Sequence, residues 1–193
     1  MVIGSSTGGP GALYEVIPRL PANLPAALLM VQHMPPVFTK SLANRLDELS
    51  NIRVKEAEPG DQIKTGHALL APGNYHMEVK MGDRITVNQK PPIGGLRPSV
   101  DITMLSASLA YGASTVGVIL TGMGSDGTKG AASIKAAGGR MLAQDEASCI
   151  VYGMPRSVAE SGYADKVVSL HDMAAEIVKM CESQLNAPEH VDG

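Results

Sequence analysis

One serine near the start of the chain stands where a nucleophile could be built. Residues 4–8 read GSSTG, the pattern G-x-S-x-G centred on Ser6, and they lie between an apolar run and a helical pattern. In a nucleophile elbow the flanking glycines permit a tight turn with a closely packed backbone. The start of a helix favours a developing oxyanion, and the natural donor is the backbone amide of Thr7. The same turn could instead bind phosphate or only pack closely.

A histidine and an aspartate follow two other apolar runs and could complete this chemistry. His33 comes directly after residues 26–32, and Asp126 lies in the glycine-rich segment 122–127. A lone histidine is more often structural, and Asp126 could be an ordinary N-cap of the next helix. In an α/β sheet, however, such loops lie at the carboxyl ends of strands, and the first two strands are normally neighbours. We therefore predict a catalytic triad that consists of Ser6, His33 and Asp126.

The other histidines and the cysteines indicate neither a metal site nor a disulfide framework. Four histidines lack partners at metal-ligand spacing, namely His67, His76, His171 and His190. A surface position is expected for His76, although it could contact a substrate. Cys149 and Cys181 are too few for a secreted disulfide framework, so we expect a reducing cytoplasm and a small buried Cys149. No cofactor and no metal are expected.

The elements that must position these loops alternate between strand and helix patterns. Strands are predicted at residues 1–3, 26–32, 52–57, 67–71, 75–80, 84–88, 116–120, 140–144 and 166–168. Helical spacing begins at Thr39, runs from Ser99 to Ala110, and returns near 155–162 and at 170–186. The alternation predicts an α/β fold, a doubly wound, mostly parallel sheet with helices on both faces. Residues 67–88 are predicted to form a small antiparallel hairpin insertion that folds over one edge of the sheet.

The composition fits one globular domain and excludes several classes of protein. The 193 residues carry a formal net charge of −3 and are 44% apolar, which argues against disorder. Aromatic residues make up 3% of the chain and no basic excess exists, so a nucleic-acid partner is not expected. No apolar run approaches the ~20 residues of a membrane span, and no signal peptide is evident. We expect a cytoplasmic domain over residues 1–187, followed by a loose tail at 188–193.

The alternative prediction for the first loop is dinucleotide binding. Gly4, Gly8 and Gly11 follow a strand, as the fingerprint for that function requires. The fingerprint also needs an acidic residue ~20 positions further on, but the second strand ends in Gln32 and is followed by His33. An α/β-hydrolase proper fits poorly as well, because its triad runs in the order serine, acid, histidine.

Five motifs resemble, in this order, the catalytic domain of one known family. They are residues 4–9 (GSSTGG), 32–35 (QHMP), 96–101 (LRPSVD), 121–127 (TGMGSDG) and 146–156 (EASCIVYGMPR). Over residues 1 to about 180 the chain resembles the bacterial chemotaxis protein-glutamate methylesterases, the CheB family. The resemblance implies a doubly wound sheet and the triad Ser6, His33 and Asp126. It also implies an oxyanion hole that includes the backbone amides of Thr7 and Met123.

The resemblance implies a substrate as well. Family members hydrolyse glutamyl methyl esters on the cytoplasmic helices of methyl-accepting chemotaxis receptors and release methanol, without cofactor or metal; some also deamidate receptor glutamines. Ser5 stands where the family often has Ala, and Ser125 where Asn is common. Arg97 and Arg156 are expected to be structural or to face the receptor.

Two further expectations concern regulation and a non-enzymatic alternative. Family members usually carry an N-terminal phospho-receiver domain. Because the first predicted strand begins at Met1, we expect either an excised catalytic domain or a stand-alone form, with a receiver on a longer or separate chain. A receptor-binding module with a dead site would show a damaged triad, and none of the three positions is damaged.

Overall fold

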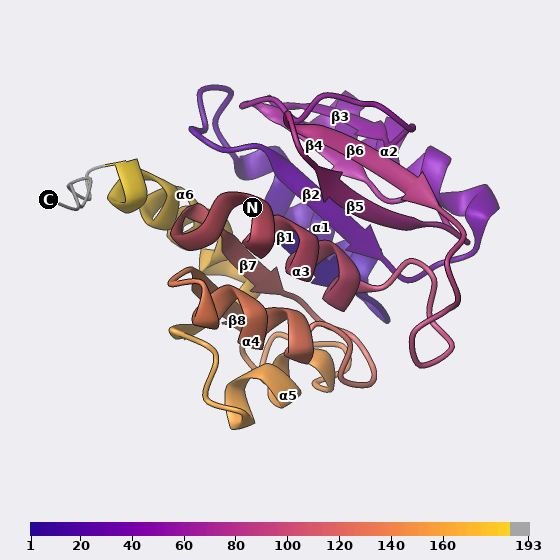
Figure 1. Ribbon diagram of the computed structural model, residues 1–193. Coiled ribbons are helices and arrows are strands. Elements are labelled where there is room, and N and C mark those ends of the chain that lie inside the picture. Colours follow the sequence, from indigo (N-terminus) through magenta and orange to yellow (C-terminus); the bar gives the residue numbers. More distant parts are fainter. Residues whose placement is uncertain (186–193) are drawn as a thin grey trace, which may run out of the picture.

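A seven-stranded sheet forms the centre of the computed structural model, which describes residues 1–185 (Figure 1). Its strands are β1 (Val2–Ser5), β2 (Leu28–Gln32), β3 (Arg53–Glu56), β4 (His67–Leu70), β7 (Val116–Ile119), β8 (Arg140–Gln144) and β9 (Lys166–Val168). They lie in the order β3-β4-β2-β1-β7-β8-β9, and every neighbouring pair is parallel. The predicted α/β class is confirmed. The expected tail at 188–193 lies outside the described residues.

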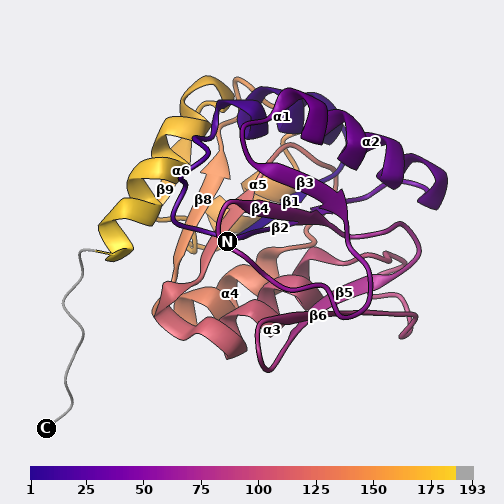
Figure 2. The ribbon, with the colours of Figure 1, turned by 90° about the horizontal axis from the view of Figure 1, so that it is seen from above.

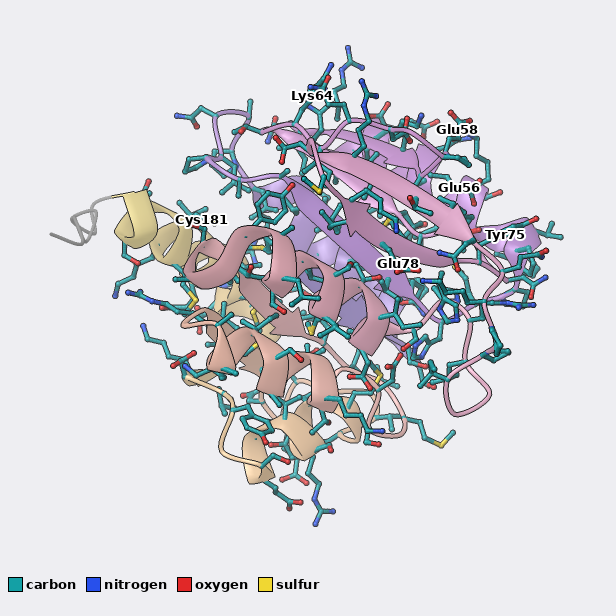
Figure 3. All side chains as sticks on the ribbon, in the orientation of Figure 1. Glu56, Glu58, Lys64, Tyr75, Glu78 and Cys181 are labelled. Atoms are coloured by element: carbon teal, nitrogen blue, oxygen red, sulfur yellow. The ribbon has the colours of Figure 1, made fainter. Side chains whose placement is uncertain are left out.

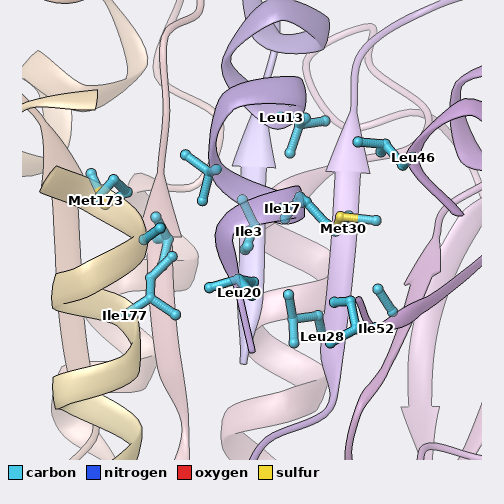
Figure 4. Close-up of a cluster of buried hydrophobic side chains, with 14 of the residues drawn as sticks. Ile3, Leu13, Ile17, Leu20, Leu28, Met30, Leu46, Ile52, Met173 and Ile177 are labelled. Atoms are coloured by element: carbon cyan, nitrogen blue, oxygen red, sulfur yellow. The ribbon is translucent and has the colours of Figure 1, made fainter. Parts of the chain in front are cut away.

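Helices cover both faces of this sheet (Figure 2). They are α1 (Gly9–Val16), α2 (Pro36–Leu49), α3 (Val100–Tyr111), α4 (Thr128–Ala136), α5 (Met154–Glu160) and α6 (Leu170–Leu185), with short 3₁₀ turns at Ile17–Arg19 and Gly112–Ser114. One core lies between the sheet and helices α1, α2 and α6, and it includes Ile3, Leu13, Leu46 and Ile177 (Figure 4). A second core lies beneath α3, α4 and α5. No helix in the described part of the chain is both long and apolar enough to cross a bilayer.

The central strands are short and apolar because both of their faces are covered. Every residue of β1, β2 and β7 is buried. Parallel strands that are covered on both faces read as continuous apolar runs instead of alternating with polar residues. Ser5 and Gln32, which end β1 and β2, are the polar exceptions within these three strands.

The direction of winding changes between β1 and β7. From β1 the chain proceeds to β2, then to β3 at the edge of the sheet, and then to β4, which lies between β3 and β2. It later continues on the other side of β1 with β7, β8 and β9. The loop after β1 leads into α1 on one face, whereas the loop after β7 leads into α4 on the other. Loops that diverge in this way leave a crevice at the carboxyl ends of the two strands, where ligands bind in such sheets.

The region predicted as a hairpin is divided between two structures. Strand β4 belongs to the main sheet, because its residues 68–70 are buried and pair with β2 and β3. Only β5 (His76–Lys80) and β6 (Arg84–Asn88) form the antiparallel pair. Met77 and Ile85 of this pair pack in the same core as Val31 of β2, so the hairpin covers a face of the sheet beside α3 (Figure 1). The predicted small antiparallel hairpin is therefore confirmed for β5 and β6, whereas its extension to residues 67–71 and its position over a sheet edge are wrong.

Helix α2 begins earlier than predicted, at Pro36, a residue type that suits the first helical position because its φ is fixed and its missing N–H is not needed there. Thr39 lies in the first turn. Its hydroxyl donates to the carbonyl oxygen of Pro36 at 2.9 Å and lies 2.5 Å from Glu56 Oε1, and it accepts from the amide of Gly73 at 3.1 Å. These bonds fix the loop after β2 against the loop after β4.

Candidate active site

Ser6 and His33 are neighbours at one edge of the sheet. Ser6 directly follows β1 and His33 directly follows β2, and these strands pair in parallel with Ser5 opposite Gln32. The amide of His33 donates to the carbonyl oxygen of Ser5 at 3.1 Å. On the other side the amide of Ser6 donates to the carbonyl oxygen of Thr121, after β7, at 3.0 Å. The predicted meeting of these loops is confirmed by the strand order β2-β1-β7.

His33 is hydrogen-bonded to Asp126, which comes from the third loop. The distance from His33 Nε2 to Asp126 Oδ2 is 2.8 Å, and the two side chains are 10% and 5% exposed. A carboxylate only accepts, so the proton of the neutral ring is on Nε2. The other nitrogen, Nδ1, then has a free lone pair and can act as a base.

The carboxylate of Asp126 is also the cap of a helix, but not of the helix that follows it. It accepts from Ser99 Oγ at 2.9 Å, from the amide of Val100 at 2.7 Å and from the amide of Asp101 at 3.0 Å, all at the N-terminus of α3. The N-cap residue of α4 is Gly127. The interpretation of Asp126 as the cap of its own helix is therefore wrong, because the loop turns its side chain toward α3 instead.

Asp101, in the first turn of α3, in turn caps the helix that follows Asp126. Its Oδ1 accepts from the amides of Gly127 and Gly130, both at 2.8 Å, and so caps α4. Burial raises the pKa of Asp101, and the charge of Asp126 adds to this effect. Burial also raises the pKa of Asp126, but hydrogen bonds from His33 and from the two α3 amides outweigh it and hold that pKa below its ordinary value. The contacts of Asp126 therefore favour its ionised form.

Ser6 has a free hydroxyl. Its side chain is partly exposed, and its Oγ has no hydrogen-bond partner among residues 1–185. The structure therefore brings His33 and Asp126 into contact but shows no hydrogen bond between Ser6 Oγ and His33. Such bonds are often long in unliganded sites and tighten when the substrate is bound.

Glycines allow the elbow to be tight. Gly8 adopts φ +82°, in the left-handed region, and a Cβ there would lie 2.7 Å from Ile150 Cβ. Gly122 lies against the serine, because a Cβ on it would lie 2.8 Å from Ser6 Cβ. Both positions therefore exclude a larger residue.

Two backbone amides beside Ser6 have no hydrogen-bond partner among residues 1–185. Neither the amide of Thr7 nor that of Met123 donates to a carbonyl or side chain within the described part of the chain. Thr7 is exposed, and Met123 is 69% exposed. Amides that are free and lie next to a nucleophile can donate to an oxyanion.

Two buried glutamines and a threonine hold this site, and the sequence prediction missed all three. Gln32 ends β2 and Gln144 ends β8, and they are 1% and 0% exposed. Gln144 Oε1 accepts from the amide of Thr121 at 2.7 Å, and Thr121 Oγ1 donates to the carbonyl oxygen of Thr7 at 2.9 Å. A glutamine at the end of an apolar strand was the available signal.

The remaining residues singled out in the sequence lie outside the reacting centre. His76 is fully buried, with Nε2 3.2 Å from the carbonyl oxygen of Pro91 and Nδ1 without a partner, so the expected surface position is wrong. Burial lowers the pKa of His76. Arg97 donates to Asn74 Oδ1 and to the carbonyl oxygens of Gln89 and Lys90, which is a structural role.

Four further side chains play no part in the site geometry. Arg156 pairs with Glu160 on the surface of α5. Cys149 is half-buried, and burial raises its pKa to about 11. Cys181 is buried on α6, across the molecule from Tyr75 (Figure 3). His67 is exposed, and His190 lies outside the described residues.

Comparisons with known proteins relate this chain to one family. The family model described as CheB methylesterase matches residues 1–177. A "Protein-glutamate methylesterase/protein-glutamine glutaminase" of Symbiobacterium thermophilum is 55% identical over 179 residues, which are 93% of this chain and 49% of that protein. A protein of the same name from Pyrococcus abyssi is 48% identical over 185 residues, covering 94% of this chain and 50% of its own length. The chain therefore spans about half the length of the curated relatives it matches.

A solved structure shows the same fold. The catalytic domain of the Thermotoga maritima CheB methylesterase superposes with a TM-score of 0.89 at 48% sequence identity, covering 92% of this chain and 96% of that one. Sequence and structure agree over nearly the whole described length, so the chain belongs to the CheB methylesterase family.

Proposed function

We propose that this chain hydrolyses glutamyl methyl esters on methyl-accepting chemotaxis receptors and releases methanol, in the cytoplasm. The observation that carries the proposal is the contact between His33 and Asp126 at 2.8 Å, on loops that neighbour the loop of Ser6, in a CheB fold. A receiver domain, on a longer or separate chain, would regulate the reaction.

The mechanism begins with Ser6 Oγ, which attacks the ester carbonyl carbon while His33 Nδ1 takes its proton. Asp126 holds the ring through Nε2 and stabilises the imidazolium that forms. The amides of Thr7 and Met123 donate to the oxyanion, and the loss of one such donor typically costs ~2.7–4 kcal/mol. The C–O bond to the methoxy group then breaks, and His33 gives its proton to the departing methanol.

A water molecule completes the cycle by the same steps. His33 takes a proton from the water, whose oxygen attacks the acyl-enzyme, and returns it to Ser6 when the acyl bond breaks. The product is a glutamate side chain. A receptor glutamine would react in the same way with ammonia as the leaving group, which accounts for the second activity in the relatives' names.

The test is methanol release from methylated receptor membranes, with Ser6→Ala as the variant. We expect no detectable turnover and an unchanged thermal midpoint, because Ser6 Oγ makes no hydrogen bond within the described chain. Ser133→Ala, which removes a hydroxyl that bonds only within α4, is the matched control and should behave as wild type. Substantial turnover by Ser6→Ala would contradict the proposal.

A further inference from the structure

The side chain of Gln32 is hydrogen-bonded to the backbone of two proposed catalytic residues, Ser6 and His33. Nε2 of Gln32 donates to the carbonyl oxygens of Ser6 and His33, at 2.9 Å and 3.0 Å. Oε1 accepts from Ser5 Oγ at 2.8 Å. Gln32 is 1% exposed, so its side-chain amide makes these hydrogen bonds inside the protein, to the residues that form the site.

The neighbours of the Gln32 amide determine which end faces which residue. The carbonyl oxygens of Ser6 and His33 can only accept, so the NH₂ end must face them. The oxygen end then faces Ser5, whose hydroxyl can donate. Ser5 therefore holds the amide of Gln32 in the one orientation that serves both carbonyls.

This arrangement fixes the peptide group between Ser6 and Thr7. The carbonyl oxygen of Ser6 accepts from Gln32 Nε2 and also from the amide of Gly9 at 2.8 Å. A trans peptide group is planar, so its N–H points away from its C=O. Two donors that hold the carbonyl inward thus hold the N–H of Thr7 outward, where no described residue accepts from it.

Gly9 leaves the space that this arrangement needs. A Cβ on Gly9 would lie 1.9 Å from Gln32 Oε1 and 2.9 Å from Ser5 Cβ. The adjacent Gly8 is required for its left-handed φ of +82°. Glycine is therefore needed at residue 8 for its backbone conformation and at residue 9 for the space that Gln32 and Ser5 occupy.

We propose that Gln32 is a positioning residue, which keeps the Thr7 amide turned toward the substrate and holds the His33 backbone beside it. The proposal rests on the proposed function, because it assigns the orientation of that oxyanion hole. Without the bond from Gln32, the amide of Gly9 is the one remaining donor to the Ser6 carbonyl among the described residues, so the Ser6–Thr7 peptide group rotates more easily. When it rotates, its carbonyl oxygen faces the developing negative charge. Catalysis falls while the substrate still binds.

The first test is Gln32→Met, which keeps the length of the side chain and removes all three hydrogen bonds. We expect kcat for methanol release to fall by about 10²-fold, the typical result of losing one oxyanion donor, with KM changed by less than about twofold. The second-order rate of Ser6 labelling by a fluorophosphonate should fall in parallel, because its phosphonyl oxygen uses the same amides.

A matched control separates positioning from lost stability. Thr115→Val likewise alters a buried polar side chain, and it removes the hydrogen bond from Thr115 Oγ1 to the carbonyl oxygen of Ala107. Thr115 directly precedes β7, so it lies at the opposite end of the sheet from the site. The substitution should lower the unfolding free energy by about 1 kcal/mol and leave kcat unchanged. A loss of kcat in Gln32→Met no larger than in Thr115→Val would overturn the proposal, and so would a rise in KM with kcat unchanged.

A spectroscopic measurement tests the peptide orientation directly. In wild type, the ¹H resonance of the Thr7 amide should move downfield when a fluorophosphonate modifies Ser6, since the amide then donates to the phosphonyl oxygen. Gln32→Met should show a smaller shift, and an equal shift would contradict the proposal.

If Gln32→Met does not fold, Ser5→Ala replaces it. With Oε1 of Gln32 released, we expect kcat to fall by about two- to fivefold and the Thr7 shift to shrink, as for a lost neutral hydrogen bond.

The labelling assay keeps this proposal distinct from the proposed function. If the wild-type chain labels at Ser6 but releases no methanol from receptors, the assignment of the substrate fails, and the labelling rates still decide the role of Gln32.

Discussion

Asp126→Asn replaces one carboxylate oxygen of the site with an amino group, and the structure determines where that group goes. Oδ2 accepts from His33 and from the amide of Val100, and Oδ1 accepts from Ser99 Oγ and from the amide of Asp101. Each oxygen therefore faces one backbone N–H, so the new NH₂ must oppose a donor in either orientation. In place of Oδ1 it opposes one donor and can still donate to the hydroxyl of Ser99, which makes this orientation the better one.

The loss of stability follows from that choice. One bond from the amide of Asp101 to a charged acceptor disappears, and a buried N–H is left without a partner. Bonds to charged groups contribute ~1.5–3 kcal/mol, and an unsatisfied buried group costs ~1–3 kcal/mol, so we expect the unfolding free energy to fall by about 3 kcal/mol. Urea denaturation at pH 7 measures this difference.

The catalytic loss has a different origin. In the preferred orientation the asparagine carbonyl still accepts from His33 Nε2, so the ring keeps the correct tautomer. What is lost is the attraction between carboxylate and imidazolium, which at ~4 Å and an effective dielectric constant near 20 is about 4 kcal/mol. The value of kcat for methanol release should therefore fall by about 10³-fold.

Asp101→Asn is the matched control, because only Oδ1 of Asp101 accepts hydrogen bonds and an asparagine oxygen can keep both of them. Its kcat should stay within about threefold of wild type, and its stability within about 1 kcal/mol. The reasoning is refuted if Asp126→Asn loses less than tenfold in kcat, or if Asp101→Asn loses as much.

The effect of pH on stability provides a second check of Asp126. Its pKa is lowered in the folded state, so the stability that its ionised form contributes is present above the unfolded value, ~3.9, and is lost as the pH falls through the folded value. The difference in stability between wild type and Asp126→Asn should therefore be constant near neutral pH and shrink below about pH 4. A difference that grows on acidification would contradict the assignment.

Two further predictions concern the loops around the nucleophile. Burial raises the pKa of Cys149 to about 11, with Asp145 and Glu146 adding to the effect, so iodoacetamide at pH 7 should label it only slowly by intact mass, and Cys149→Ala should keep its activity. Gly8→Ala forces an alanine into φ +82° with its Cβ 2.7 Å from that of Ile150, which should lower the unfolding free energy by about 3 kcal/mol and kcat by more than tenfold. Gly11→Ala, where nothing lies within 4 Å of the added Cβ, should change neither.

The sequence was sufficient for the parallel sheet and for the positions of its loops, because both depend on local patterns. Buried parallel strands must be apolar on both faces, and the run at residues 26–32 shows this directly. The hairpin was placed wrongly because an apolar segment such as 67–71 fits a hairpin strand and a central strand equally well. Its pairing with β2 and β3 is a long-range property that the pattern does not contain.

The polar contacts were less predictable, because they join segments far apart in the chain. His76 looked like a surface residue, yet it is buried where the loop containing Pro91 folds over it. Asp126 has the spacing of an N-cap, but no local signal shows that the start of α3 lies nearer to its side chain than the start of α4 does. Gln32 ends a predicted strand and opens one of the five motifs, but nothing in the local pattern shows that its side chain bonds to Ser5 and to the backbone of Ser6.

The position of Asp126 explains why the loop after β7 is rich in glycine. The acid must reach His33 at the end of β2, and β1 lies between β7 and β2. The loop therefore has to pass close over the nucleophile, and it does so at Gly122, where a Cβ would lie 2.8 Å from Ser6 Cβ.

The helix that receives Asp126 must in turn lie directly against the centre of the sheet. A Cβ on Gly4 would lie 2.5 Å from Val100 Cγ1, so a glycine in β1 lets the N-terminus of α3 approach. A Cβ on Gly127 would lie 2.5 Å from Ile119 Cδ1, and its φ is +100°. The glycines at 4, 122 and 127 thus permit the close packing of β1, α3 and the loop after β7, and this packing brings an acid after β7 to a base after β2. The order serine, histidine, acid along the chain follows from this strand order and not from the chemistry.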